Sequence, residues 1–423
     1  MEPKQLLTQS FRAAVAAADP LKILPAHLPH PPSGKTLVVG AGKAAASMAL
    51  AVERHWPRDA ALEGLVITRY RHGLPTRRVK VIEAGHPVPD ETGESAAKEI
   101  LQRVRSLSPS DLLLALISGG GSALLSLPVE AIGMEALKAT TRELLRSGAP
   151  IQDMNTVRKH LSSIQGGRLA AACKAPVLAL IISDVTGDDP THIASGPCAP
   201  DPTTYRDALE VLHRHGVNAP PAVRQHLERG AGGEVSETPK PGDKIFARVE
   251  NRVIATARQA LRAAQEFFHG HRIHAMNLGD SVTGEASEVA KVYAALARQI
   301  AQYADPMKPP VALISGGECT VTVRGNGRGG RCSEFLLSLG IELAGIPNVY
   351  AIAGDTDGID GSEDNAGAVL LPDSLVRGAR LGLDAGKLLA DNDAYGFFSR
   401  LEDLVVTGPT RTNVNDYRAI LIR

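Results

Sequence analysis

Short, almost wholly apolar segments recur along the chain, and nearly every one ends in a loop of glycine, hydroxyl and carboxylate residues. Residues 112–117 and 177–182 contain no polar side chain at all. Strands that are buried on both faces of a parallel sheet need this composition. Segments with the spacing of amphipathic helices lie between them, so the sequence predicts an α/β fold with mostly parallel sheets.

The length of 423 residues exceeds what one ordinary hydrophobic core supports, and we expect two α/β domains. A stretch rich in glycine and proline, residues 230–242, is the best candidate for the linker. We therefore place an N-terminal domain at residues 1–235 and a C-terminal domain at residues 244–423. The first amphipathic helix, near residues 4–18, is expected to pack on either of them.

The overall composition argues against several classes of function. Basic and acidic side chains are balanced at 46 each and only 4% of residues are aromatic, which disfavours a nucleic-acid-binding or membrane-binding protein. The four cysteines have no paired spacing, so neither a disulfide framework nor a zinc cluster is expected. No apolar run is long enough to span a membrane, and the N-terminus lacks a signal peptide. We expect a cytoplasmic protein with a small-molecule substrate; homo-oligomer formation stays open.

Ligands of open parallel sheets bind beyond the carboxyl ends of the strands, so the loops there are candidate binding elements. Glycine lets backbone N–H groups approach phosphate oxygens and form anion-binding nests. The candidate residues for binding nucleotide and substrate are Gly42, Ser118, Gly119, Gly120, Gly121, Ser122, Gly316, Gly317, Glu318, Asn413 and Asn415.

Charged side chains in the same loops supply the other requirements of phosphoryl transfer. Carboxylates are hard oxygen ligands that suit Mg²⁺, and a carboxylate near an acceptor hydroxyl can take its proton. Lys43 and Arg331 are the candidate cations that offset charge on a transferring phosphoryl group. Arg331 is expected at a helix start, where a cation is disfavoured unless an anion lies nearby. The candidate metal ligands are Asp184, Asp189, Asp355 and Asp357, and Asp184 is also a candidate catalytic residue.

Three other interpretations stay open. Residues 40–45, Gly-Ala-Gly-Lys-Ala-Ala, match a dinucleotide fingerprint between a strand and a helix, although the next strand ends in Arg69, which disfavours NAD and leaves NADP. Any single glycine loop can be purely structural, and Asp188, Asp360 and Asp364 are interpreted as turn-formers or helix caps. A binding protein without catalysis is the third class.

The loops in this order resemble the glycerate 2-kinase family that carries a C-terminal MOFRL domain, some members of which are named hydroxypyruvate reductase. The resemblance rests on nine short motifs at residues 39–44, 85–90, 118–122, 183–185, 195–197, 316–318, 329–331, 354–358 and 412–416. It implies ATP- and Mg²⁺-dependent phosphorylation of D-glycerate to 2-phosphoglycerate, in a cleft between a Rossmann-like domain and the MOFRL domain. It also implies that Lys43 and Arg331 are essential.

Two departures from the family pattern bear on the substrate. The family usually has Asn-Gln where Cys332 and Ser333 stand here, and usually glycine at the position of Arg411. Both are expected to affect acceptor choice or phosphate contacts. An NAD(P)H-dependent hydroxypyruvate reductase is the alternative activity, and the sequence does not indicate which domain binds ATP.

Overall fold

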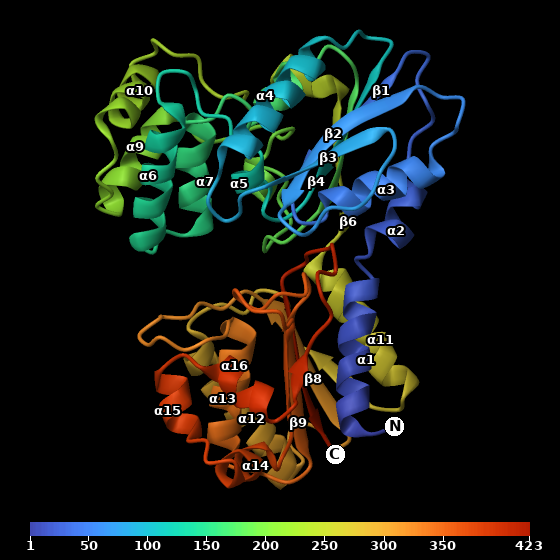
Figure 1. The fold of residues 1–423 in the computed structure, drawn as a ribbon, viewed down its shortest axis with the longest axis vertical. Coiled ribbons are helices and arrows are strands. Elements are labelled where there is room, and N and C mark those ends of the chain that lie inside the picture. The colour runs from blue at the N-terminus through green and yellow to red at the C-terminus, as the bar shows by residue number, and fades with distance from the viewer. The chain divides into compact units, whose positions relative to one another are not determined.

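A computed structural model describes all residues from Met1 to Arg423, and the chain divides into two compact units (Figure 1). The first unit is continuous and comprises Pro20–Ile254, whereas the second combines Met1–Asp19 with Ala255–Arg423. Each unit has one six-stranded sheet and helices that pack against it. The prediction of two α/β domains is therefore confirmed.

The sheet of the first unit has the strand order β3-β2-β1-β4-β5-β6, which is the order of a Rossmann fold. β1 pairs in parallel with both β2 and β4, β2 pairs in parallel with β3, and β4 with β5. All residues of β1, β4 and β5 are buried, as their apolar sequences predict. The strands are β1 Thr36–Ala41, β2 Leu62–Arg69, β3 Val79–Ala84, β4 Leu112–Ile117, β5 Val177–Ile182 and β6 Val249–Ala255.

The helices of this unit form two groups. Buried residues of α4 and α8 share a hydrophobic core with the sheet, whereas α6, α7, α9 and α10 enclose a smaller core of their own and stand together in Figure 1. The helices are α2 Pro20–Ile23, α3 Ala45–His55, α4 Glu91–Arg105, α5 Gly121–Leu124, α6 Gly133–Arg146, α7 Ile151–His160, α8 Arg168–Ala171, α9 Tyr205–Arg214 and α10 Pro221–Ala231.

The sheet of the second unit has the order β11-β10-β9-β12-β8-β7. β7, β8, β9 and β11 run in one direction, while β10 and β12 run the opposite way, so only the β7–β8 pairing of neighbours is parallel. The last strand, β12, lies in the middle of the sheet between β8 and β9. The strands are β7 His274–Asn277, β8 Val311–Gly317, β9 Val349–Asp355, β10 Gly367–Leu370, β11 Leu404–Val405 and β12 Asp416–Ile422.

The first helix, α1 (Pro3–Ala16), belongs to the second unit. It packs beside α11 and places the buried ring of Phe11 against Tyr417 of β12, with 5.9 Å between the ring centres. The Tyr417 hydroxyl donates a hydrogen bond to Ser10 Oγ at 2.8 Å. The other helices of this unit are α11 Ala257–Gly270, α12 Ala286–Tyr303, α13 Arg331–Leu343, α14 Ser374–Arg380, α15 Ala385–Ala390 and α16 Ala394–Arg400.

The boundary between the units lies at a different residue from the linker that the sequence predicts. The structure divides the chain after Ile254, because β6 extends the first sheet beyond β5, whereas residues 230–242 lie within the first unit. The predicted ranges of 1–235 and 244–423 therefore need one correction, because β6 joins the first unit; the first helix joins the second unit, one of the two placements expected for it.

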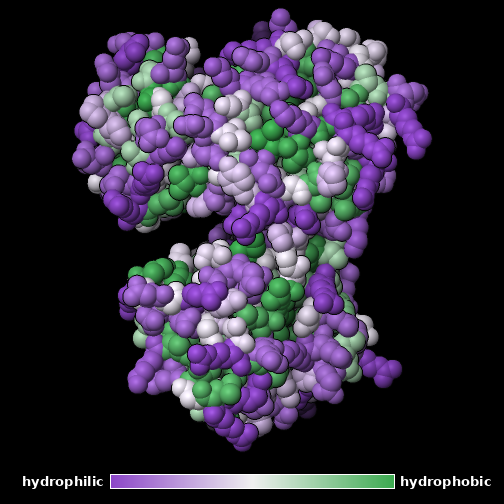
Figure 2. Space-filling view, viewed as in Figure 1, coloured by the Kyte–Doolittle hydropathy of each residue, from purple (hydrophilic) through white to green (hydrophobic).

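Hydrophilic residues dominate the molecular face shown in Figure 2, with small hydrophobic areas between them. No helix combines the length and the apolar character needed to cross a membrane. The cysteines Cys173, Cys198, Cys319 and Cys332 are buried free thiols.

Candidate functional site

The loops after β1 and β4 meet at the carboxyl edge of the first sheet, because Ala41 and Ile117 are level in the parallel register. The Lys43 N–H donates to Gly119 O at 2.8 Å, and the next N–H in the chain, that of Ala44, donates to Ser118 Oγ at 3.1 Å. The strand order reverses between β1 and β4, which is where open α/β sheets bind ligands. The structure therefore brings the predicted residues Lys43 and Ser118 to a favourable position.

Gly42 has a steric reason to be glycine. Its φ is 139°, and a Cβ atom there would lie 2.1 Å from Ser118 Oγ. The close approach of the two loops depends on the missing side chain.

Gly119 and Gly120 present backbone donors at this edge. Their N–H groups donate to no acceptor of the protein. Gly120 has a left-handed φ of 80°, and a Cβ atom there would lie 3.0 Å from His86 Nε2 and 3.4 Å from Lys43 Cγ. Unpaired N–H groups beside a lysine suit an anionic ligand, and they support the predicted cradle.

The same contacts weaken the dinucleotide interpretation of residues 40–45. A dinucleotide site leaves the N–H groups at the start of its helix free for the pyrophosphate. Here the N–H groups of Lys43 and Ala44 are taken by the β4 loop, and that of Ala45 by Gly42 O at 3.1 Å. The fingerprint is present as a sequence, but its phosphate-binding donors are occupied.

Ser122 connects the loop after β4, residues 118–121, which we call the glycine loop, to a second buried segment. Its hydroxyl oxygen lies 2.9 Å from that of Ser195, which in turn donates to Asn155 Oδ1 at 3.1 Å. Gln165 Nε2 donates to Ser122 O at 2.9 Å. Ala194 and Ser195 both have left-handed φ angles, 52° and 57°, and fully buried Ser195 is held there by these hydrogen bonds.

The predicted metal ligands Asp184 and Asp189 lie in the loop after β5, at the same sheet edge. Asp184 is partly buried, whereas Asp189 is exposed and accepts a hydrogen bond from Thr191 N–H at 3.0 Å. Neither side chain belongs to a group of three or more acidic, histidine or cysteine residues that could hold a metal ion.

The second unit gathers its charged residues where β8, β9 and β12 meet. In the register, Asp416 at the start of β12 is level with Gly317 at the end of β8 and Asp355 at the end of β9. Arg331, the first residue of α13, donates through Nε to both oxygens of Asp416 at 3.0 Å and through Nη2 to Asp355 Oδ2 at 2.8 Å. Its Nη1 lies 3.2 Å from Glu318 Oε1.

Arg331 is at a helix start, as predicted, and three carboxylates rather than a bound phosphate satisfy it. Burial alone would lower the pKa of Arg331, but Asp416, Asp355 and Glu318 raise it well above the usual value. The side chains of Asp416 and Asp355 are 0% and 3% exposed, so removing the guanidinium would leave Arg418 as the remaining arginine beside Asp416 and take the Arg331 charge away from buried Asp355.

A second arginine, the buried Arg418, completes this group. Arg418 Nη2 donates to Asp416 Oδ2 at 2.8 Å, and the same guanidinium donates to Gly316 O and Gly317 O at 3.1 and 3.3 Å. A Cβ atom on Gly317 would lie 2.4 Å from Val282 O. The glycines at the end of β8 thus have a packing role, besides the ligand-binding role that the sequence predicts for Gly316, Gly317 and Glu318.

Asp360 caps α13, as the sequence analysis interprets it. Its carboxylate accepts from the N–H groups of Cys332 and Ser333 at 3.0 and 2.8 Å, and from Ser333 Oγ at 2.5 Å. Burial raises the pKa of Asp360 although these hydrogen bonds oppose the rise. Both Cys332 and Ser333 are buried, so any effect of these departures on a ligand must pass through the position of α13.

The loop before β12 is held by the turn after β9. Thr356 donates from its N–H and its hydroxyl to Asn415 O at 3.2 and 2.7 Å, and Asn415 N–H donates to Asn413 Oδ1 at 3.3 Å. Asp357 Oδ1 accepts from Ile359 N–H at 2.8 Å. The predicted residues Asn413, Asn415 and Asp357 therefore stabilise this turn.

Arg411 in this loop has a left-handed φ of 60°, which gives a physical reason for the glycine usual at this position in the family that the sequence resembles.

The carboxylates fit Mg²⁺ in chemistry, but the structure does not collect them into one cluster. Asp355 and Asp357 lie in one turn, and the Asp355 oxygens accept from Arg331 and from Asp357 N–H. No group of three acidic, histidine or cysteine side chains is arranged to hold a metal ion. Mg²⁺ often needs only one or two carboxylates beside phosphate oxygens and water.

Three residues at these edges, Asp416, His86 and Ser195, were not among the predicted site residues. Asp416 appeared only as the end of a motif, because its contact with Arg331 depends on the register of β12. His86 follows β3 and lies beside Gly120, and Ser195 lies beside Ser122. The order of loops after strands was the signal for His86, whereas Ser195 was marked only as the first residue of the motif at residues 195–197.

Comparisons with known proteins cover nearly the whole chain. The model described as "Domain of unknown function (DUF4147)" matches residues 6–228, and the model described as "MOFRL family" matches residues 311–416. A protein of Agrobacterium vitis with the provisional name hydroxypyruvate reductase is 48% identical over 99% of this chain and 94% of its own length. The "Glycerate 2-kinase" of Pyrococcus horikoshii is 40% identical over 90% of this chain and 86% of its own.

Among solved structures, the glycerate kinase of Thermotoga maritima superposes with a TM-score of 0.87 at 36% identity, covering 99% of both chains.

Proposed function

This chain belongs to the glycerate 2-kinase family with a MOFRL domain, and from that premise we propose that it transfers the γ-phosphoryl group of ATP to the 2-hydroxyl of D-glycerate. The products are 2-phosphoglycerate and ADP. The relatives that carry an unqualified activity name are glycerate kinases, and the provisional reductase name of other relatives does not outweigh them.

The main support for the proposal among the residues is the carboxyl edge of the first sheet, where Lys43 lies beside the β4 loop. Two backbone N–H groups without acceptors, a lysine and the point of strand reversal lie together there. Phosphoryl transfer relies on positioning and charge stabilisation, and these groups supply both for an anionic ligand.

The carboxylate-rich edge of the second unit favours a ligand that brings a cation. Asp355, Asp416 and Glu318 face the two guanidinium groups of Arg331 and Arg418, so the acids outnumber the bases. A nucleotide that carries Mg²⁺ matches this balance better than a bare phosphate does.

When bound, Mg²⁺ neutralises charge on the phosphate oxygens. We propose Asp184 and Asp189 as candidate ligands within the first unit, and Asp355 and Asp357 as candidate ligands within the second. Asp184 is also our candidate for taking the proton from the acceptor hydroxyl.

The test is ADP release with D-glycerate, tartronate, lactate and hydroxypyruvate as acceptors, and identification of the phosphorylated carbon by NMR. We expect D-glycerate to be phosphorylated at carbon 2, and turnover to stop with excess EDTA and return with Mg²⁺. Lys43→Ala should lower kcat by at least about 100-fold, as expected when a charge-stabilising group is lost. Phosphorylation at carbon 3, or no ADP release with any of the acids, contradicts the proposal.

The reductase alternative has its own measurement, which is NADPH absorbance in the presence of hydroxypyruvate. The occupied N–H groups of Lys43 and Ala44 argue against dinucleotide binding, and we expect no oxidation of NADPH. Turnover of NADPH at a rate comparable to ADP release would favour the reductase.

A further inference from the structure

A narrow pocket beside the glycine loop of the first unit contains an arginine without a partner. Arg158, from the last turns of α7, lines this pocket together with Ser122, Ser162 and Gln165. Pro87, in the loop after β3, forms part of its wall. The pocket thus adjoins both the β4 loop and the His86 loop, which the candidate site uses.

Arg158 is partly buried, and its guanidinium forms no hydrogen bond and no ion pair with any group of the chain. Burial lowers the pKa of Arg158 to about 10, and no acidic group offsets the effect. The group stays cationic at neutral pH. Two arginines of the second unit contrast with it, because Arg331 and Arg418 both contact Asp416. A partly desolvated guanidinium without a counter-ion is unfavourable, and an incoming anion would reduce that cost.

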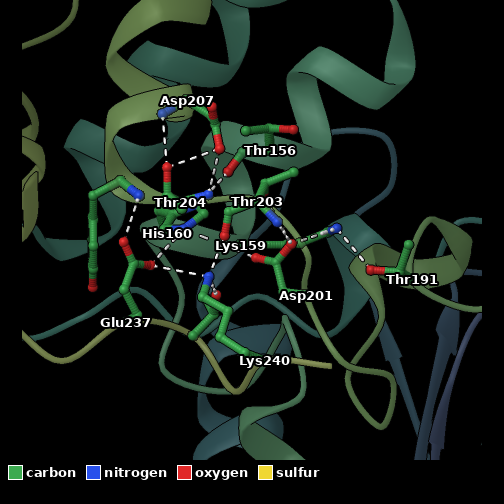
Figure 3. Close-up of polar contacts among 12 residues, drawn as sticks. Thr156, Lys159, His160, Thr191, Asp201, Thr203, Thr204, Asp207, Glu237 and Lys240 are labelled. Carbon is green, nitrogen blue, oxygen red and sulfur yellow. Dashed lines mark hydrogen bonds and ion pairs between the residues drawn. The ribbon is translucent and has the colours of Figure 1, made fainter. Parts of the chain in front are cut away.

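The neighbouring residue holds the backbone of Arg158 in place. Lys159 is fully buried and donates from Nζ to Asp201 Oδ1 at 3.2 Å and to Thr191 Oγ1 at 2.9 Å, as Figure 3 shows. His160, the next residue, is bound through Nδ1 to Thr156 O at 2.8 Å. These contacts fix the end of α7, so Arg158 is presented to the pocket from a rigid helix turn.

The surroundings of the guanidinium select one kind of anion. The pocket is narrow, and Leu127 and Leu137 contribute apolar wall beside the hydroxyls of Ser122 and Ser162. A single planar guanidinium with adjacent hydroxyl groups matches one planar carboxylate, which accepts two parallel hydrogen bonds. A triphosphate needs several cations, whereas Arg158 is the one cationic residue that lines this pocket.

We propose that Arg158 binds the carboxylate group of the hydroxy acid acceptor. This inference rests on the proposed function and names the residue that makes the enzyme prefer acids as acceptors. Ser122 then lies between the carboxylate and the glycine loop and contacts the same ligand. Arg158 is a binding residue, and the proton transfer and phosphoryl transfer do not involve it.

The test compares the Arg158→Gln and Arg158→Lys variants with Arg146→Gln, a control on the exposed side of α6. We expect the Kd for D-glycerate, measured by calorimetry, and its KM to rise about 10- to 100-fold in Arg158→Gln, the effect of losing a hydrogen bond to a charged group. Arg158→Lys should recover part of the affinity, because it keeps the charge but not the fork. The Kd for ATP should stay within about twofold in all three variants, and thermal melting checks that each is folded.

Several outcomes decide between this inference and the proposed function. If the wild type phosphorylates D-glycerate and Arg158→Gln keeps the wild-type KM, the inference about Arg158 is wrong and the proposed function stands. Weaker ATP binding with unchanged D-glycerate binding assigns Arg158 to the phosphates and overturns the inference as well. A wild-type chain that phosphorylates none of the hydroxy acids overturns the proposed function and the inference together. If Arg158→Gln does not fold, an unchanged KM in Arg158→Lys overturns the inference and a raised one supports it.

Discussion

Replacing Lys159 by methionine should destabilise the first unit strongly. Methionine keeps most of the length of the side chain, so the main loss is the charge opposite Asp201. Both side chains of the pair are 0% exposed. Breaking a buried ion pair by removing one partner costs about 3–5 kcal/mol, because the remaining charge is stranded. For a unit of this size, that corresponds to a fall in Tm of about 6–20 °C.

The fluorescence of Trp56 is the appropriate assay. It is the single tryptophan of the chain, it is buried, and it lies in the first unit. Urea denaturation followed by tryptophan emission therefore reports on that unit, while far-UV circular dichroism reports on both. The Lys4→Met variant, which removes a half-exposed lysine of the second unit, is a matched control that should leave the tryptophan transition unchanged.

The double variant Lys159→Met/Asp201→Asn separates a stranded charge from lost packing. The introduced asparagine would keep an oxygen to accept from Thr203, which in the wild type donates its N–H and hydroxyl to Asp201 Oδ1 at 3.0 and 2.7 Å. We expect the double variant to be about 1–3 kcal/mol more stable than Lys159→Met, the usual range of coupling between groups in contact. If Lys159→Met costs less than about 1 kcal/mol, or the second substitution restores nothing, the reasoning about the buried pair is wrong.

Three further predictions concern other parts of the chain. In the wild type, burial would raise the pKa of Asp201, but Lys159 and Thr203 hold that pKa below its ordinary 3.8, so the stability of the first unit is lost as pH falls through the folded pKa. In Lys159→Met, burial should raise the pKa of Asp201. The urea midpoint of this variant should then fall as pH rises through the raised pKa. Gly42→Ala should cut turnover at least about tenfold and lower the stability of the first unit by about 1–3 kcal/mol, since the new Cβ meets Ser118 Oγ; wild-type kinetics and melting would contradict this. Asp360→Ala should lower the stability of the second unit by about 1–2 kcal/mol through loss of the α13 cap, measured by circular dichroism, with exposed Asp364→Ala as the control.

The sequence predicts most strands and the order of the loops, because buried parallel strands have a composition that other structures rarely share. β4 and β5 have the bounds that the apolar runs indicate. β6 and β10 were not predicted, since β6 contains three consecutive polar residues, Glu250 to Arg252, and β10 has only four residues. The reversed direction of β12 was also outside the reach of local patterns, because strand direction is set by long-range pairing.

The candidate residues were predictable where a motif follows a strand directly. Lys43 and Ser118 come together because β1 and β4 are neighbours, and Arg331 begins α13 as its preceding glycines suggest. The three carboxylates around Arg331 were not predicted as its partners, since they come from separate strand ends. Arg158 has no motif around it, and only the pocket and the missing counter-ion single it out.

The position of β12 has a consequence for biosynthesis. The second sheet lacks a middle strand until residues 416–422 have left the ribosome, and part of the surface that α1 covers, which includes α11, β9 and β12, is missing until then. The first unit is one continuous segment, made after α1 and before the rest of the second unit, so it can fold during translation. Ribosome-bound chains that stop before residue 416 should therefore carry a protease-resistant first unit and a protease-sensitive remainder, and α1 should be cleaved until the last strand is released.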